Sequence, residues 1–172
     1  MSEQQMAAAV GRELATELAN ALARIRHCLD QLTTEQLWSR PADDMNSIGN
    51  LLLHLTGNVR QWLISGLGGK PDQRNRPAEF AERRAISKKE VCSALESSVA
   101  DARRLLAAQT AETWLRGRRI QGFDVTGIGA AIDSVAHFRG HTQEIVHMTR
   151  ALLGTRYRFA WVPATKEQGS PA

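Results

Sequence analysis

Residues 126–153 read TGIGAAIDSVAHFRGHTQEIVHMTRALL and contain three of the five histidines of the chain. Apolar residues recur at helical spacing, Thr126 begins the stretch and Gly154 follows it, so it predicts a long helix. His137 and His141 lie four residues apart and therefore share a helix face. That face also carries apolar residues, which predicts that it is turned to the protein interior: Ala130, Ile145, Met148 and Leu152.

Two of the three histidines outside this pair are predicted to be exposed. His147 projects with the polar side of the same helix, beside Arg139 and Arg150, and we expect it to be exposed. His27 follows Arg24 and Arg26 in the N-terminal part of the chain and is predicted to lie at the surface. Neither histidine is a candidate ligand.

Three further long helices are predicted from apolar periodicity and capping residues. They cover residues 5–32, the stretch from Asn46 or Ser47 to the glycines at 66, 68 and 69, and residues 87–109. A short helical turn at 33–38 begins with Thr33 and Gln36 at capping-box spacing. The sequence contains no convincing strand. It therefore predicts an all-α four-helix bundle.

Two long connections join these helices, so we expect that not every neighbouring pair is an up-down hairpin. Residues 67–86 form a loop rich in proline, arginine and asparagine, and a second connection ends in GFDVTGIG. The arginine clusters of both connections are interpreted as solvated. Residues 1–163 are expected to form a single domain, in which YRFAWVP packs back in extended form. Residues 164–172 are expected to be a flexible tail.

Composition narrows the functional class. With 172 residues, 42% of them hydrophobic, the chain suits one globular domain, and no apolar run is long enough to span a bilayer. The N-terminus has no signal-peptide pattern, and Cys28 and Cys92 make no disulfide framework, so we expect a cytoplasmic protein with buried thiols. The net charge of +4 comes without a dense basic stripe. It suits an anionic small molecule and gives no reason to expect nucleic acid binding or a membrane partner.

Two buried histidines on adjacent turns need partners, because an unpaired buried polar group destabilises the fold. A metal ion is one solution, and hydrogen bonds to neighbouring helices are the other. His54 belongs to a polar, uncharged stripe of the second helix with Asn50, Asn58 and Gln61. This stripe either lines a wet cavity or forms a modest solvent face. If the second and fourth helices are neighbours, three histidines converge with positions left open for water or substrate.

The stretches NSIGNLLLHLTGNVRQWLISGLGGKPDQRNRPAEF and HFRGHTQEIVHMTRALLG resemble the DinB-like (DinB/YfiT) superfamily of metal-binding four-helix bundles. The resemblance extends from about RHCLDQLTTEQLWSRP to Gly154. It implies that His54, His137 and His141 are ligands of a divalent metal, commonly zinc or nickel. It also implies a frequent homodimer, and its characterised members include transferases and isomerases that use low-molecular-weight thiols.

Two positions, Glu144 and Gly140, differ from the pattern of the family. Glu144 stands where glutamine is usual and is a candidate partner of a ligand, a candidate acid or base, or a surface carboxylate. Asp133, one turn before His137, is a weaker candidate of the same kind. Gly140 replaces an aromatic residue and is expected to open space near the metal.

The hypothesis that follows is a metal-dependent enzyme acting on a small-molecule substrate, a thiol-dependent transferase or a related enzyme. Asn50 and Asn58 are expected to position the substrate, and arginines of the 67–86 loop to bind carboxylates of a thiol cofactor. The alternative is a non-catalytic, metal-stabilised binding or interaction module. Fold resemblance does not choose between them, because function belongs to the site.

Overall fold

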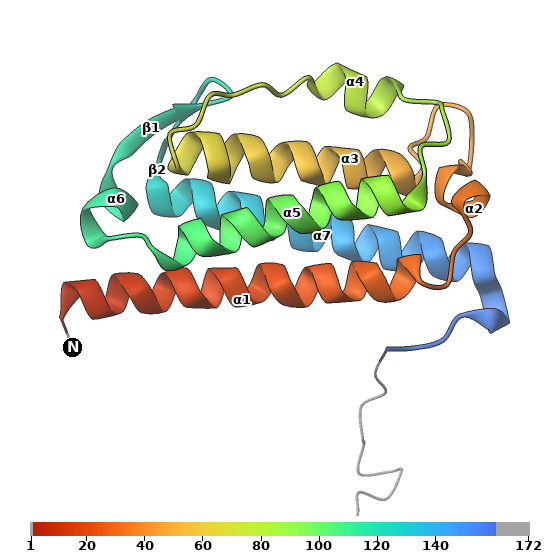
Figure 1. Ribbon diagram of the computed structural model, residues 1–172, viewed down its shortest axis with the longest axis horizontal. Coiled ribbons are helices and arrows are strands. Elements are labelled where there is room, and N and C mark those ends of the chain that lie inside the picture. The colour runs from red at the N-terminus through yellow and green to blue at the C-terminus, as the bar shows by residue number, and fades with distance from the viewer. Residues whose placement is uncertain (1, 161–172) are drawn as a thin grey trace, which may run out of the picture.

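A computed structural model describes residues 2–160, which form a four-helix bundle (Figure 1). The long helices are α1 (Glu3–Leu29), α3 (Ile48–Val59), α5 (Lys88–Ala107) and α7 (Gly127–Leu153). The shorter elements are α2 (Thr34–Trp38), η1 (Arg60–Leu67), α4 (Arg76–Ala81), α6 (Ala111–Leu115), β1 (Gly117–Ile120), β2 (Phe123–Thr126) and η2 (Gly154–Arg156). The predicted all-α bundle is confirmed.

The order of the helices in space differs from their order in the chain. α1 packs against α5 and α7, and α3 packs against the same two helices, so α1 and α3 occupy opposite corners. In Figure 1, α1 and α7 run in one direction while α3 and α5 run in the other. Consecutive long helices are therefore diagonal or parallel, and none forms a simple antiparallel hairpin. The long connections predicted this for some of the pairs, and it holds for all of them.

The parallel pair α3 and α5 requires a connection that returns along the whole bundle. Residues 68–87 make this crossover on the outer side of α3, and α4 lies within it against α3 (Figure 1). The sequence predicted this segment as an irregular loop. The structure adds the helix α4, which Asn75 caps by accepting a hydrogen bond from the amide of Ala78 and which has proline in its first turn.

Helix boundaries follow the capping residues read from the sequence. Ser47 caps α3 in a capping box with Asn50, Thr33 caps α2 with Gln36, and Thr126 caps α7. The core between the four long helices consists of fully buried aliphatic and aromatic side chains: Leu18, Ile25, Leu51, Leu55, Leu95, Leu106, Phe138 and Ile145. Burial of these side chains supplies the main driving force for the bundle.

The inward face of α7 is largely as predicted. Ala130 and Ile145 are fully buried and Met148 packs against the core, but Leu152 is 37% exposed, so its inward prediction is wrong. Leu152 lies in the last turn of α7, where the helix runs past the other helices (Figure 1). His147 is exposed, as predicted.

The expectation that the chain has no strands is wrong, because β1 and β2 form an antiparallel hairpin. Ile120 pairs with Phe123, which leaves Gln121 and Gly122 as a two-residue turn. Both have positive φ, 51° and 84°, as a type I′ turn requires. Gln121 is an unfavourable residue there. The four-residue strands and the absence of an Asn-Gly or Asp-Gly pair hid the hairpin from periodicity.

The segment after α7 returns to the first helix. The backbone of Arg158 accepts a hydrogen bond at 2.6 Å from His27 and donates one at 2.8 Å to Gln31. His27 is therefore half-buried instead of lying free at the surface. Residues 157–160 fit the predicted packing of YRFAWVP, whereas its remainder and the predicted tail at 164–172 lie outside the described residues.

Within residues 2–160, no helix has both the length and the apolar character needed to cross a membrane. Both cysteines are free thiols. Cys28 is buried as predicted, while Cys92 is half-buried.

The close approach of α1 and α5 depends on Gly11. A Cβ atom at this position would lie 2.1 Å from the carbonyl oxygen of Leu106, whereas one at Gly140 of α7 would meet nothing within 4 Å. We expect Gly11→Ala to lower the free energy of unfolding by about 1–3 kcal/mol, since α1 and α5 must separate. Gly140→Ala should raise it by about 0.5–1 kcal/mol through helix propensity. Urea unfolding of both variants measures the difference, and a stabilised Gly11→Ala would contradict the close contact.

Candidate metal centre

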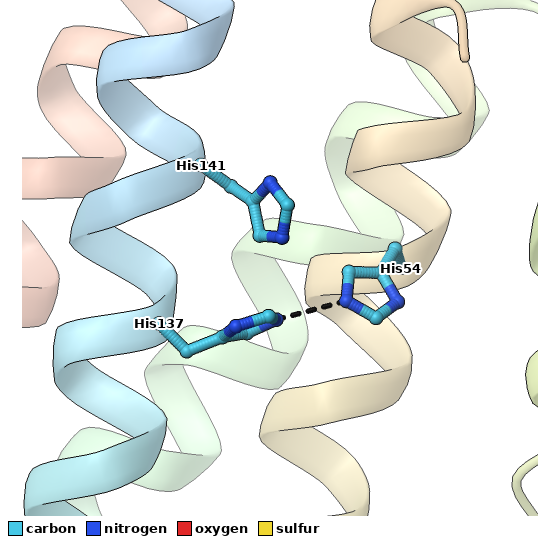
Figure 2. A group of neighbouring side chains, drawn as sticks. All are labelled: His54, His137 and His141. Atoms are coloured by element: carbon cyan, nitrogen blue, oxygen red, sulfur yellow. Dashed lines mark hydrogen bonds between the residues drawn. The ribbon is translucent and has the colours of Figure 1, made fainter. Parts of the chain in front are cut away.

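Three histidines from two helices converge on one point between α3 and α7 (Figure 2). His137 and His141 project from successive turns of α7, and His54 faces them from α3. One ring nitrogen from each histidine lies within 4.8 Å of the others. His54 is 4% exposed, and the other two are half-buried. The helices α3 and α7 are thus neighbours, as the prediction of three converging histidines required.

The contacts of His54 assign its tautomer. Its Nδ1 lies 2.9 Å from Oε2 of Glu79, and its Nε2 lies 2.8 Å from Nε2 of His137. Nη2 of Arg74 also lies 3.0 Å from this Nδ1, but it donates to the same Oε2 of Glu79 at 2.9 Å. An ionised carboxylate only accepts, so a proton on Nδ1 of His54 satisfies Glu79 and lets Nε2 present its lone pair to His137. The dashed line in Figure 2 marks this contact, in which Nε2 of His137 is the donor.

Glu79 reaches His54 from α4 of the crossover. Its carboxylate is 9% exposed and accepts two hydrogen bonds from Arg74, at 2.7 Å from Nε and 2.9 Å from Nη2. The Arg74 side chain is 3% exposed, and its Nη1 also donates to Gln61 at 2.9 Å. Burial raises the pKa of Glu79, but the hydrogen bonds and charges of Arg74 and His54 outweigh it and hold this pKa below its ordinary value. Glu79 is therefore a carboxylate that fixes the orientation of His54.

Gly57 provides the room for this ion pair on the surface of α3. A Cβ atom at Gly57 would lie 1.9 Å from Oε1 of Glu79 and 2.9 Å from Nε of Arg74. The carboxylate and the guanidinium thus lie directly against the helix backbone, one turn after His54.

Glu144 has the same relation to His141 that Glu79 has to His54. Its Oε2 lies 2.6 Å from Nδ1 of His141, one turn earlier on α7, although the carboxylate is 46% exposed. An ionised Glu144 makes Nδ1 the protonated nitrogen and leaves Nε2 of His141 with its lone pair. Two of the three histidines therefore donate from Nδ1 to a carboxylate, the arrangement that orients imidazole ligands in metal sites.

The protonation of the cluster also suits a metal. Burial, followed by the charges of His141 and His54, lowers the pKa of His137 to about 4. This ring is neutral at pH 7, the form in which histidine binds metals. Three neutral imidazoles form the donor set of zinc and related ions, and they leave coordination positions open. The three histidines can therefore hold a divalent metal ion.

A cavity of about 260 Å³ opens beside His54 and His137. Side chains from α3, η1, the crossover, the hairpin turn and α7 complete its wall: Asn58, Trp62, Arg74, Arg76, Gln121 and Asp133. A larger cavity of about 600 Å³ lies between the crossover, α3 and α5, on the other side of Arg74 and Glu79, and no histidine lines it. The smaller cavity is the one next to the candidate ligands.

The remaining predicted residues occupy different places. Asn58 is buried and lines the small cavity. Asp133 also lines this cavity, and among the described residues it makes no hydrogen bond to His137. Asn50 lies outside this cavity, because its amide binds Ser47 and the backbone carbonyls of Glu79 and Glu82. Gly140 faces open space.

The polar stripe of the second helix is not a solvent face, because Asn50, His54 and Asn58 are all buried. The crossover covers this side of α3 (Figure 1). The interpretation of residues 74–84 as a solvated charge cluster is wrong for Arg74 and Glu79. Their opposite charges five residues apart were the only signal in the sequence, and such a spacing is common on exposed surfaces.

Comparison with known proteins supports the fold. Residues 7–166 match the family described as a protein of unknown function (DUF1572). No curated protein matches the chain. Among solved structures, the conserved protein of locus from Enterococcus faecalis is similar, with 18% identity, a TM-score of 0.70, and 82% of this chain and 95% of that chain covered.

Two structures of DinB-like proteins are also similar. The one from Bacillus cereus has 15% identity and a TM-score of 0.65, with 81% of this chain and 90% of that chain covered. YjoA from Bacillus subtilis has 14% identity and a TM-score of 0.64, with 86% and 96% covered. At these identities the likeness concerns the fold, which is that of the DinB-like bundles.

Removal of one member of the buried ion pair leaves the other charge without compensation. We expect Glu79→Gln to lower the free energy of unfolding by about 3 kcal/mol, because Arg74 stays buried. The double variant Arg74→Met/Glu79→Gln should be more stable than Glu79→Gln, since no unpaired charge remains. Urea unfolding of the four proteins in the cycle measures the coupling. Additive effects of the two substitutions would contradict a coupled pair.

Proposed function

Because this chain belongs to the DUF1572 family and has the DinB-like fold, we propose that it binds a divalent metal ion and uses it in a reaction on a small molecule. The observation that supports this most is the convergence of His54, His137 and His141 beside a cavity. Zinc and nickel are the proposed ions, since both accept imidazole nitrogen.

The proposed reaction is a thiol-dependent transfer. A bound divalent ion lowers the pKa of a thiol or water and so supplies a nucleophile near neutral pH. The thiolate sulfur forms a bond to an electrophilic carbon, and the leaving group departs with the electron pair of the bond that breaks. The thiol proton passes to solvent or to Glu144, which is exposed enough to exchange it.

The side chains around the site have separate roles in this proposal. Glu79 holds His54, and Glu144 holds His141, so the proton of each ring is on Nδ1 and the lone pair is on Nε2. Trp62, 8% exposed, excludes water from one wall of the cavity. Asn58 faces the space where a substrate would lie. Asn50 supports the site only indirectly, through the crossover backbone that carries Glu79.

A non-catalytic role is the second candidate, and one observation favours it. His54 belongs to α3 and the other two histidines to α7, so a bound ion would link two helices that are far apart in the sequence. Such a link stabilises the folded state over the unfolded state. This candidate predicts a rise in melting temperature with metal and no catalytic turnover.

The proposal also includes the cellular compartment and the oligomeric state of the protein. Both cysteines are free thiols, which fits a reducing compartment such as the cytoplasm. We also propose a homodimer, on the resemblance to DinB-like proteins, and the mass in solution measured by light scattering tests it.

The first prediction concerns metal content. Untagged purified protein should contain about one zinc, nickel or similar ion per chain, because three imidazoles suffice for tight binding. His54→Ala and His137→Ala should each lose it, as measured by elemental analysis. His147→Ala, an exposed histidine of the same helix, is the matched control and should retain it. No bound metal after reconstitution with zinc or nickel would overturn the metal site.

The second prediction concerns turnover. Metal-loaded protein should accelerate the consumption of a low-molecular-weight thiol with an electrophile such as chlorodinitrobenzene, because the ion increases the thiolate fraction. His137→Ala should lose metal and activity together, while His147→Ala keeps both. Activity that persists in verified metal-free protein would rule out this mechanism. Metal binding with no turnover across a panel of thiols and electrophiles would favour the non-catalytic role.

A further inference from the structure

The polar groups that line the cavity beside His54 and His137 are mainly donors. Asn58 is 7% exposed, and Oδ1 of its amide accepts a hydrogen bond at 2.9 Å from Ser134. Its Nδ2 has no partner among residues 2–160. This Nδ2 is open to the cavity and donates to no protein group there, so water or a ligand can accept from it.

Gln121 presents a second donor from the hairpin turn. The indole Nε1 of Trp62 lies 3.1 Å from Oε1 of Gln121. Because an indole N–H only donates, this contact assigns the oxygen to the Trp62 side and leaves the Nε2 group free for the cavity. The residue holds this position at a φ of 51°, which is unfavourable for glutamine. Strain of this kind is found where the surrounding structure requires a particular side chain.

Arg76 supplies a positive charge on the crossover side. Its guanidinium lies over the ring of Phe80, 4.9 Å from the centroid, and it forms no ion pair within the described part of the chain. Phe80 in turn packs against His54, with ring centroids 4.8 Å apart. Stacking on an aromatic ring orients the guanidinium and leaves its N–H groups available. Arg74 differs, since Glu79 and Gln61 already accept from it.

The acceptors of the cavity are fewer. Among the described residues, Asp133 is the one carboxylate on its wall, and it is exposed. The Ser134 hydroxyl is used by Asn58, and the Gln121 oxygen is used by Trp62. A divalent ion held by three neutral imidazoles would add two further positive charges beside this wall.

We propose that this cavity binds the oxyanion group of a small substrate or thiol, such as a carboxylate or sulfonate, through Asn58, Gln121 and Arg76. A volume of about 260 Å³ suits a small molecule or one arm of a larger one. This proposal rests on the proposed function in one respect, namely that the other end of the ligand reacts at the metal held by the histidines. The oxyanion would accept hydrogen bonds from the N–H groups that have no partner within residues 2–160.

The test uses thiols of equal length and opposite charge. Zinc-loaded, isotope-labelled protein is titrated with mercaptoethanesulfonate, mercaptoethanol and thiocholine, and the side-chain amide signals of Asn58 and Gln121 are followed by NMR. Neither the sulfonate nor the quaternary ammonium chelates zinc well, so the charge of the second group decides the difference. We expect the sulfonate to shift both amide signals and to bind about tenfold more tightly than thiocholine.

Variants distinguish the contribution of the cavity wall to ligand binding from the effect of the net charge of the protein. Arg76→Met and Gln121→Gly should each weaken the sulfonate about tenfold and leave mercaptoethanol unchanged. Glycine also relieves the positive φ at the turn, so Gln121→Gly should fold at least as well. Arg12→Met, on α1 and outside this cavity, removes the same charge and should have little effect. Asp133→Asn should strengthen sulfonate binding.

A titration with ethanesulfonate, which has no thiol, distinguishes the two proposals. If ethanesulfonate shifts the two amide signals but the thiol adds no affinity, the oxyanion site stands and thiol binding at the metal fails. If thiols bind zinc equally well whatever their charge, the proposed function stands and the oxyanion site is overturned. The absence of any amide shift with both sulfonates, or tighter binding of thiocholine, would also overturn it.

Discussion

The ion pair between Arg74 and Glu79 links the crossover to the centre of the molecule. Both side chains are buried, and a buried charge is stable only when it is paired and hydrogen-bonded. The pair meets this condition through His54 and Gln61, so the position of the crossover and the orientation of His54 depend on the same contacts. Gly57 allows the pair to lie against α3. A change at any of these positions therefore affects both the fold and the candidate metal centre.

The cavity depends on two irregular elements at one end of the bundle. The π-helical segment η1 continues α3 and brings Gln61 to Arg74 and Trp62 to the cavity wall. π-helical turns are frequent at functional sites, because they change which side chains face the interior. The hairpin packs onto the same segment, and a Cβ atom at Gly66 would lie 2.4 Å from Ile120. The long helices thus hold the histidines, while η1 and the hairpin shape the space beside them.

The charges around the histidines have an ordered arrangement. Glu79 and Arg74 compensate each other in the interior, whereas Glu144 holds His141 from the partly exposed side. His137 remains neutral at pH 7, since burial lowers its pKa to about 4. A divalent ion at this point would keep most of its charge available for an anionic ligand. The cavity wall, with its free N–H donors, is complementary to such a ligand.

Local patterns in the sequence were sufficient to predict the four long helices, their caps and the inward direction of His137 and His141, because helical periodicity and capping act within a few residues. The polar stripe of the second helix made His54 a candidate third ligand, and the resemblance to DinB-like proteins agreed with it. The partners of these histidines were less accessible: Glu144 was a candidate one turn away, but Glu79 lies 25 residues from His54 and carries no local signal. The hairpin was missed because its short strands gain their stability from packing on η1 and α7. Whether Asn50, His54 and Asn58 face solvent or a cavity depended on the path of the crossover, and only contacts between distant segments determine that path.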